Sequence, residues 1–190
     1  MRTFFAFVIL LLLGIAIYVY TRDVDPVVPE PTPPIVEEER LISFSSDEYG
    51  ISFTYPEEYE LSEMNAPGSE VREHYIITLI RKEDLPPPQG GEGPPAITID
   101  IIQNNLDNRD TEEWIRGDSR SNFKLGEMRL STTSVSGMQA FSYRWSGLYE
   151  GTTVAIARPN WIYAFSVTYL ELGADIVQDF VTVRDSVRLQ

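Results

Sequence analysis

The side chains that could perform catalysis or bind a metal are few in this chain. His74 is the only histidine and there is no cysteine, so a histidine triad, a multi-histidine metal site and a thiolate site would each lack a partner. No serine lies in a Gly-x-Ser-x-Gly turn, which a nucleophilic serine of the hydrolase type requires. We predict a surface or strand-edge role for His74, no catalytic, cofactor or metal site, and a protein that is not an enzyme.

Two groups of acidic residues have structural explanations. Asp107, Asp110, Glu112 and Glu113 lie close together, but they lack the Asp-x-Asp-x-Asn-Gly spacing of a calcium loop. Asp110 and Glu113 have instead the spacing of a helix capping box. The glutamates within 57–60 point in different directions along a strand and its loop, which indicates a solvated face rather than a pair of hydrolytic carboxylates.

Aromatic residues mark the part of the chain that the rest must pack around, 138–168. Tyr143, Trp145, Trp161 and Tyr163 alternate with smaller residues, and a period of two favours a core or a half-buried sheet face. The alternative is a pocket for a small apolar ligand or a sugar, since aromatic side chains with polar tips line such pockets. The glycines of the 85–95 loop are not followed by Gly-Lys-Ser or Gly-Lys-Thr, so they do not form a phosphate loop.

Strands must position most of these residues. Alternation of apolar residues predicts strands at 51–55, 59–64, 71–81, 96–103 and 128–135, followed by a three-stranded antiparallel meander over 138–168. A helix is expected from Asp110 to about Ser121. A second helix is expected after Asp175, which we take as its N-cap with Gln178 completing the box, although the many β-branched residues of 176–187 leave a strand open.

The first 22 residues predict a membrane anchor. Phe4 to Tyr20 is an uninterrupted apolar run, just long enough to span a bilayer. Arg2 and the terminal amine form a positive flank that favours the cytoplasmic side. Residues 1–22 are therefore interpreted as the signal anchor of a single-pass cell-membrane protein, with the remainder extracytoplasmic. The alternative is a signal peptide cleaved at Gly14-Ile15-Ala16, which would also export the domain.

Composition separates a linker from a globular domain. Residues 23–40 are rich in proline and glutamate, which predicts a semi-rigid, extended linker of about 3.1 Å per residue. Residues 41–190 then form one globular domain. The formal charge of −14 repels polyanions, so no nucleic-acid partner is expected.

Several short motifs of this domain resemble the PsbP-like family, which comprises the extrinsic subunit P of the photosystem II oxygen-evolving complex and its bacterial relatives. The matching segments are Tyr49–Tyr59, Trp114-Ile115, Val135–Ala140, Trp161–Tyr169 and Phe180–Val187. The resemblance implies an α/β fold of the α+β type: a central antiparallel β-sheet flanked by helices on both faces, an α/β/α sandwich, here behind an N-terminal transmembrane helix. It also implies an accessory, assembly or lipid-carrying role rather than catalysis.

Anchor, linker and resemblance together predict a membrane-anchored accessory or scaffold domain that binds a protein partner at the cell envelope. The alternative is a carrier or sensor that holds a lipid or another small apolar molecule in an aromatic-lined pocket. A partner surface requires an apolar area open to solvent, whereas a carrier requires an enclosed cavity of some hundreds of Å³.

Overall fold

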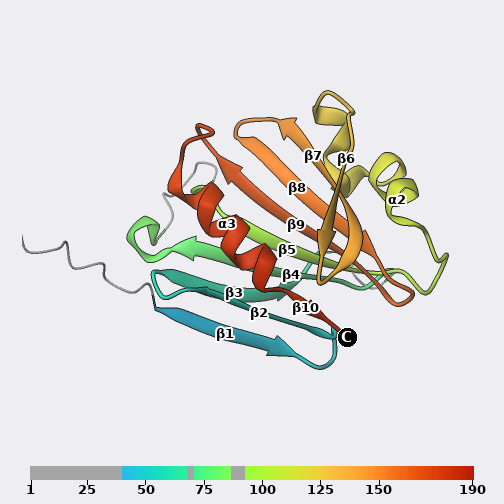
Figure 1. Cartoon of the computed structure of the whole chain (residues 1–190), viewed down its shortest axis with the longest axis horizontal. Helices are drawn as coiled ribbons and strands as arrows, with labels where there is room; N and C mark the ends of the chain where they lie inside the picture. The colour runs from blue at the N-terminus through green and yellow to red at the C-terminus, as the bar shows by residue number, and fades with distance from the viewer. Residues whose placement is uncertain (1–39, 68–70, 87–92) are drawn as a thin grey trace, which may run out of the picture. The chain divides into compact units, whose positions relative to one another are not determined.

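Two antiparallel sheets and two α-helices make up the part of the chain that the computed structural model describes, residues 40–67, 71–86 and 93–190 (Figure 1). These residues belong to one compact unit. The predicted anchor, 1–22, and residues 23–39 of the predicted linker lie outside the described residues. Within the described ranges, no helix has the length and apolar character needed to cross a membrane.

The larger sheet has seven strands in the order β3-β4-β5-β9-β8-β7-β6, and each pairs antiparallel with its neighbours. The smaller sheet has the order β1-β2-β10. The strands are β1 Leu41–Ser46, β2 Ile51–Pro56, β3 Tyr59–Asn65, β4 His74–Arg81, β5 Ile97–Gln103, β6 Ser131–Val135, β7 Met138–Ser146, β8 Glu150–Ala157, β9 Trp161–Tyr169 and β10 Arg188–Leu189. The predicted meander is thus confirmed as β7, β8 and β9.

Helices and 3-10 turns lie between these strands. The α-helices are α2 Thr111–Gly117 and α3 Asp175–Ser186, and the 3-10 turns are η1 Lys82–Asp84, η2 Ser119–Ser121 and η3 Phe123–Leu125. The strand alternative for the C-terminal segment is therefore wrong, because Ile176, Phe180 and Val183 are buried on one side of α3.

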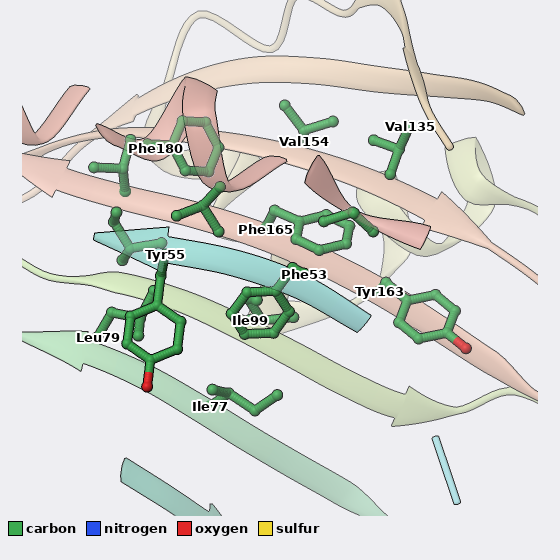
Figure 2. Close-up of a cluster of buried hydrophobic side chains, with 14 of the residues drawn as sticks. Phe53, Tyr55, Ile77, Leu79, Ile99, Val135, Val154, Tyr163, Phe165 and Phe180 are labelled. Atoms are coloured by element: carbon green, nitrogen blue, oxygen red, sulfur yellow. The ribbon is translucent and has the colours of Figure 1, made fainter. Parts of the chain in front are cut away.

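Alternation along the central strands creates two hydrophobic cores. Phe165 of β9 belongs to the first core, together with Phe53 of β2 and Phe180 of α3, and Figure 2 shows these side chains converging between the sheet and α3. The neighbouring Ala164 points to the opposite face, where Trp114 of α2 and Phe123 of η3 form the second core. Each face of the larger sheet thus has its own cover.

The structure confirms a mixed α+β fold and adds a layer that the sequence did not predict. α3 shares the first face with the three-stranded sheet, since it contacts both β2 and β9, while α2 contacts β7 and β8 on the second face. β1 was missed because its residues are mostly exposed, and β10 has only two residues, too few for any periodic pattern.

The two helix starts differ. The predicted capping box of α2 is confirmed: the Glu113 backbone N–H donates to Asp110 Oδ1 at 2.8 Å, and the Asp110 N–H donates to Glu113 Oε2 at 3.3 Å. α2 ends at Gly117 rather than Ser121, because Asp118 is extended and caps the next turn, η2. The predicted box of α3 is wrong, since Ala174 is the N-cap, without a side-chain hydrogen bond, and Asp175 is already helical.

A polar contact ties α3 to the edge of the larger sheet. The hydroxyl of buried Tyr59 donates to Asp179 Oδ2 at 2.5 Å, and the Arg81 guanidinium donates to the same oxygen at 2.6 Å. Arg81 Nε also donates to the Tyr59 hydroxyl at 3.0 Å. Because an unpaired buried polar group is costly, this triad fixes where α3 crosses the sheet.

The two helix starts give a matched test. Asp110→Ala removes the carboxylate that accepts from the Glu113 N–H and leaves the backbone arm of the capping box in place, so we expect the free energy of unfolding to fall by about 1 kcal/mol. Asp175→Ala removes only a first-turn charge, with an expected loss of about 0.5 kcal/mol or less. Chemical denaturation of both variants measures the difference. Equal losses would contradict the assignment of the two caps.

Candidate functional site

His74 lies at the first residue of β4 and interacts with the neighbouring strand. Its Nε2 is 2.7 Å from Asp100 Oδ1 of β5, and both side chains are partly buried. The register opposes Ile76 to Asp100 and His74 to Ile102, so the pair is a diagonal cross-strand contact of the kind that stabilises sheets. His74 was predicted at the surface or a strand edge, but it is partly buried on β4, which lies between β3 and β5. Asp100 was not foreseen because it lies 26 residues away in the chain.

The acidic residues near α2 are used by arginines and by the helix cap. Arg72 binds Asp107 with two hydrogen bonds of 3.0 and 2.8 Å, and Arg109 Nε donates to the same carboxylate at 2.6 Å. Arg109 and Arg120 both donate to Asp118, at 3.2 and 2.6 Å. Arginine and aspartate side chains thus alternate in a network of five residues. This network holds the segment between β5 and η2, which includes α2. Within the described ranges, no three histidine, aspartate or glutamate side chains converge as metal ligands would.

The structure separates the four aromatic residues that were considered as a pocket. Tyr143 and Trp145 lie with the second core, whereas Tyr163 and Trp161 lie with the first. Buried Tyr143 donates its hydroxyl to the Ser121 carbonyl, and buried Tyr163 donates to the Tyr49 carbonyl. The four side chains are therefore on opposite faces of the sheet and do not line one shared pocket.

Trp145 and Trp161 are half-buried and each has a structural partner. A Cβ at Gly151 would lie 2.3 Å from the Trp145 ring, so that ring rests directly on the Gly151 backbone. Trp145 Nε1 also donates to Thr153 Oγ1 at 2.9 Å. The Trp161 ring meets Tyr49 edge-on, with 5.2 Å between the ring centroids. These contacts favour the prediction of a half-buried sheet face.

An open hollow of about 630 Å³ lies beside the end of β7. We call it the β7 groove, and its lining residues are Gly126, Glu127, Arg129, Ser131, Ser142, Tyr143, Arg144, Trp145, Ser146, Glu150 and Thr152. It exists because β6 begins at Ser131, opposite Ser142, so that β7 has no strand partner on this side beyond Ser142. The loop before β6 crosses there instead.

Close backbone contact holds that loop against β7. A Cβ at Gly126 would lie 2.1 Å from the Arg144 carbonyl oxygen, so only glycine allows the approach. The lining carries both signs of charge: Glu127 and Arg129 form an exposed ion pair at 3.5 Å, and exposed Arg144 faces the same hollow. The β7 groove is therefore polar, with hydroxyl and guanidinium donors.

Exposed apolar side chains gather at the same end of the sheet. Five of the ten large apolar residues exposed in the described ranges are there, namely Leu125, Met128, Leu148, Leu170 and Leu172. Glu150 of β8 is opposite Tyr169 of β9, which places the turn containing Leu148 beside the loop containing Leu170. We call these five residues the apolar rim. The Gly126 contact with Arg144 places Leu125 and Met128 at the same end of the sheet. Single exposed apolar residues are ordinary, but several at one end of a sheet make that end a candidate interaction surface.

The sequence contained only part of the signal for this surface. Leu148, Leu170 and Leu172 stand outside the strand periodicity and could have been noted as exposed loop residues. The β7 groove could not be found in the same way, because it depends on where β6 begins along β7. That boundary was predicted at residue 128 but lies at Ser131.

Comparison with known proteins identifies the fold. No family model and no curated protein sequence matches the chain. The solution structure of cyanobacterial PsbP (CyanoP) from Synechocystis sp. PCC 6803 matches with a TM-score of 0.51 and 13% identity, over 85% of this chain and 99% of that one. A crystal structure from Bacteroides thetaiotaomicron VPI-5482 matches with a TM-score of 0.46 and 11% identity, over 78% of this chain and 48% of that one. The predicted PsbP-like fold is confirmed by the first match, and at this identity the similarity concerns the fold alone.

The alternating arginine and aspartate side chains near α2 predict that the protein is less stable in acid. Burial by itself would raise the pKa of Asp118, but the hydrogen bonds from Arg120 outweigh burial and lower this pKa to about 2. Since the pKa of an unfolded aspartate is about 3.9, the ionised carboxylate contributes roughly 2 to 3 kcal/mol above the unfolded pKa. This contribution falls away as the pH drops from about 5 toward 2.

Asp118→Asn should remove that part of the pH dependence. We expect the unfolding free energy of the variant to be lower than that of the wild type at pH 6, and the gap between the two to shrink by about 2 kcal/mol toward pH 2. Urea denaturation across this pH range measures both proteins. A gap independent of pH would contradict the role assigned to the carboxylate.

Proposed function

We propose that the chain is a non-enzymatic, membrane-anchored accessory protein whose PsbP-like domain binds a protein partner on the extracytoplasmic side of the cell membrane. The observation that carries the proposal is the apolar rim, which places five exposed apolar side chains around one end of the larger sheet. Fully buried anchors flanked by polar groups that form hydrogen bonds are typical of protein interfaces. The β7 groove supplies the polar groups beside the rim.

Anchor and linker support this role. An apolar run of the length of Phe4–Tyr20 spans a bilayer, and the proline-rich linker would hold the domain at a distance from the membrane. The rim and the β7 groove would then meet partners in the envelope. The domain's charge is in keeping with a display role, because high net charge of one sign keeps an exposed domain soluble and monomeric.

A carrier of a small apolar ligand is the second candidate, and one observation favours it. The volume of the β7 groove, about 630 Å³, is within the usual range for small-molecule sites. Its lining is less suitable, because serines, a threonine and charged side chains predominate and the aromatic side chains considered for the pocket lie on opposite faces of the sheet. A protein partner therefore fits this surface better.

The apolar rim is tested by matched charge substitutions in the full-length chain. We expect the wild-type protein, extracted from its native membrane with a mild detergent, to migrate as a complex with another protein. Leu148→Asp and Leu170→Asp should lower the yield of this complex at least tenfold, as the loss of buried anchors does. Leu106→Asp is the control, because Leu106 is similarly exposed but lies in the loop after β5.

Thermal unfolding of each variant provides the control for folding, and we expect changes of no more than about 2 °C because all three side chains are exposed. A complex that survives both rim substitutions would contradict the assignment of the rim. A wild-type protein that migrates alone would contradict partner binding itself.

A further inference from the structure

The outer edge of β6 carries free backbone hydrogen-bonding groups. Ser136 and Gly137 have φ of 52° and 74°, and two positive φ values in a two-residue connection define a type I′ hairpin. In such a hairpin the flanking residues, Val135 and Met138, form a hydrogen-bonded pair, and these pairs recur at every second residue. Because the register between β6 and β7 is uninterrupted, the backbone N–H and C=O groups of Thr132 and Ser134 point away from β7.

An independent contact supports this orientation. The same alternation directs the backbone groups of even-numbered β7 residues toward β6, and the Arg144 carbonyl oxygen indeed faces the Gly126 loop on that side. β6 is the last strand in the order of the larger sheet, and none of the described residues pairs with its outer side (Figure 1).

β6 also lacks the features by which proteins protect an edge strand. Its sequence, Ser-Thr-Thr-Ser-Val, has no charge and no proline, and its register has no bulge. The opposite edge strand, β3, carries Glu60 and Glu63. Because charges, prolines and bulges normally block edge-to-edge pairing, the contrast identifies β6 as the open edge of the larger sheet.

Arginines lie at both ends of this edge. Arg129 and Arg144 line the β7 groove next to Ser131. A second hollow, of about 500 Å³, lies at the other end of β6, where Arg184 and Arg188 line it together with Ser134. Three carboxylates share these hollows: those of Glu127 and Asp185 are paired with Arg129 and Arg184, and that of Glu150 accepts from the Ser146 hydroxyl. On a chain with a formal charge of −14, the uncharged edge strand of the larger sheet thus has four arginines and three carboxylates beside it. Arg144 and Arg188 form no ion pair with any other described residue, so their guanidinium groups can receive a partner's carboxylates.

We infer that the partner adds an extended, acidic segment to the larger sheet along the outer edge of β6. Backbone hydrogen bonds to Thr132 and Ser134 would supply affinity, as in other cases of strand addition, and the flanking arginines would select carboxylates. The inference rests on the proposed function and specifies how the partner is held. A second copy of this chain is a poorer occupant, because two domains of high negative charge repel each other.

The test places a photoreactive phenylalanine analogue at Ser134 in the full-length protein in its native membrane. We expect a crosslink to an acidic, extended segment of another protein, which peptide mass spectrometry identifies. Thr132→Pro removes an outward N–H and leaves the inward groups of Thr133 intact, so the crosslink yield should fall about tenfold. Thr132→Val is the matched control, because it keeps the N–H and should keep the yield.

Charge variants test the same edge without changing any residue of β6. Arg129→Glu and Arg188→Glu should each lower the crosslink yield severalfold, and more strongly at low salt. Lys82→Glu, on the far side of the sheet in η1, should have no effect. These variants decide the question if Thr132→Pro proves to unfold the domain.

The outcomes separate this inference from the proposed function. A crosslink to β6 of a second copy, or one indifferent to both Thr132→Pro and the arginine variants, would overturn strand addition by an acidic partner. If the detergent-extracted complex forms but Ser134 gives no crosslink, strand addition fails while partner binding stands. If neither is seen, both proposals fail.

Discussion

Burial of both faces of β5 and β9 is the constraint on which the rest of the structure depends. Ile99 and Phe165 are buried on one face, and Ile102, Ile162 and Ala164 on the other. A sheet that is apolar on both sides needs two covers, and the chain supplies α3 with the small sheet for one face and α2 with its 3-10 turns for the other. The two covers leave the edges and one loop end of the larger sheet as the part of it considered for binding.

The sequence predicted the elements better than their ends and contacts. Alternating residues such as Trp161, Tyr163 and Phe165 identified the meander because both faces of a buried strand carry a strong local signal. The capping box at Asp110 was also local and was correct. The cap assigned to Asp175 was wrong because residue propensities do not determine which residue is the first in the helix. The contact of His74 with Asp100 could not be predicted because only strand pairing brings the two residues together.

The candidate site illustrates the same limit. It depends on β6 being shorter than β7, on a glycine that lets the preceding loop touch the Arg144 carbonyl, and on β8 beginning beside the end of β9. Each is a relation between distant segments rather than a motif. Together they leave one end of the larger sheet with exposed leucines, and one edge without charge but flanked by arginines, on an otherwise acidic domain. The proposal of a protein partner rests on these features of the surface.

Display of the domain outside the membrane is the central claim, because every proposed contact depends on it. The chain has no cysteine, so a single introduced cysteine reports its own location. We would measure labelling of Thr32→Cys in the linker, and of Thr3→Cys before the apolar run, with a membrane-impermeant maleimide on intact cells. The account predicts that Thr32→Cys is labelled and that Thr3→Cys is labelled only after the membrane is permeabilised. Labelling of Thr32→Cys only after permeabilisation would contradict it.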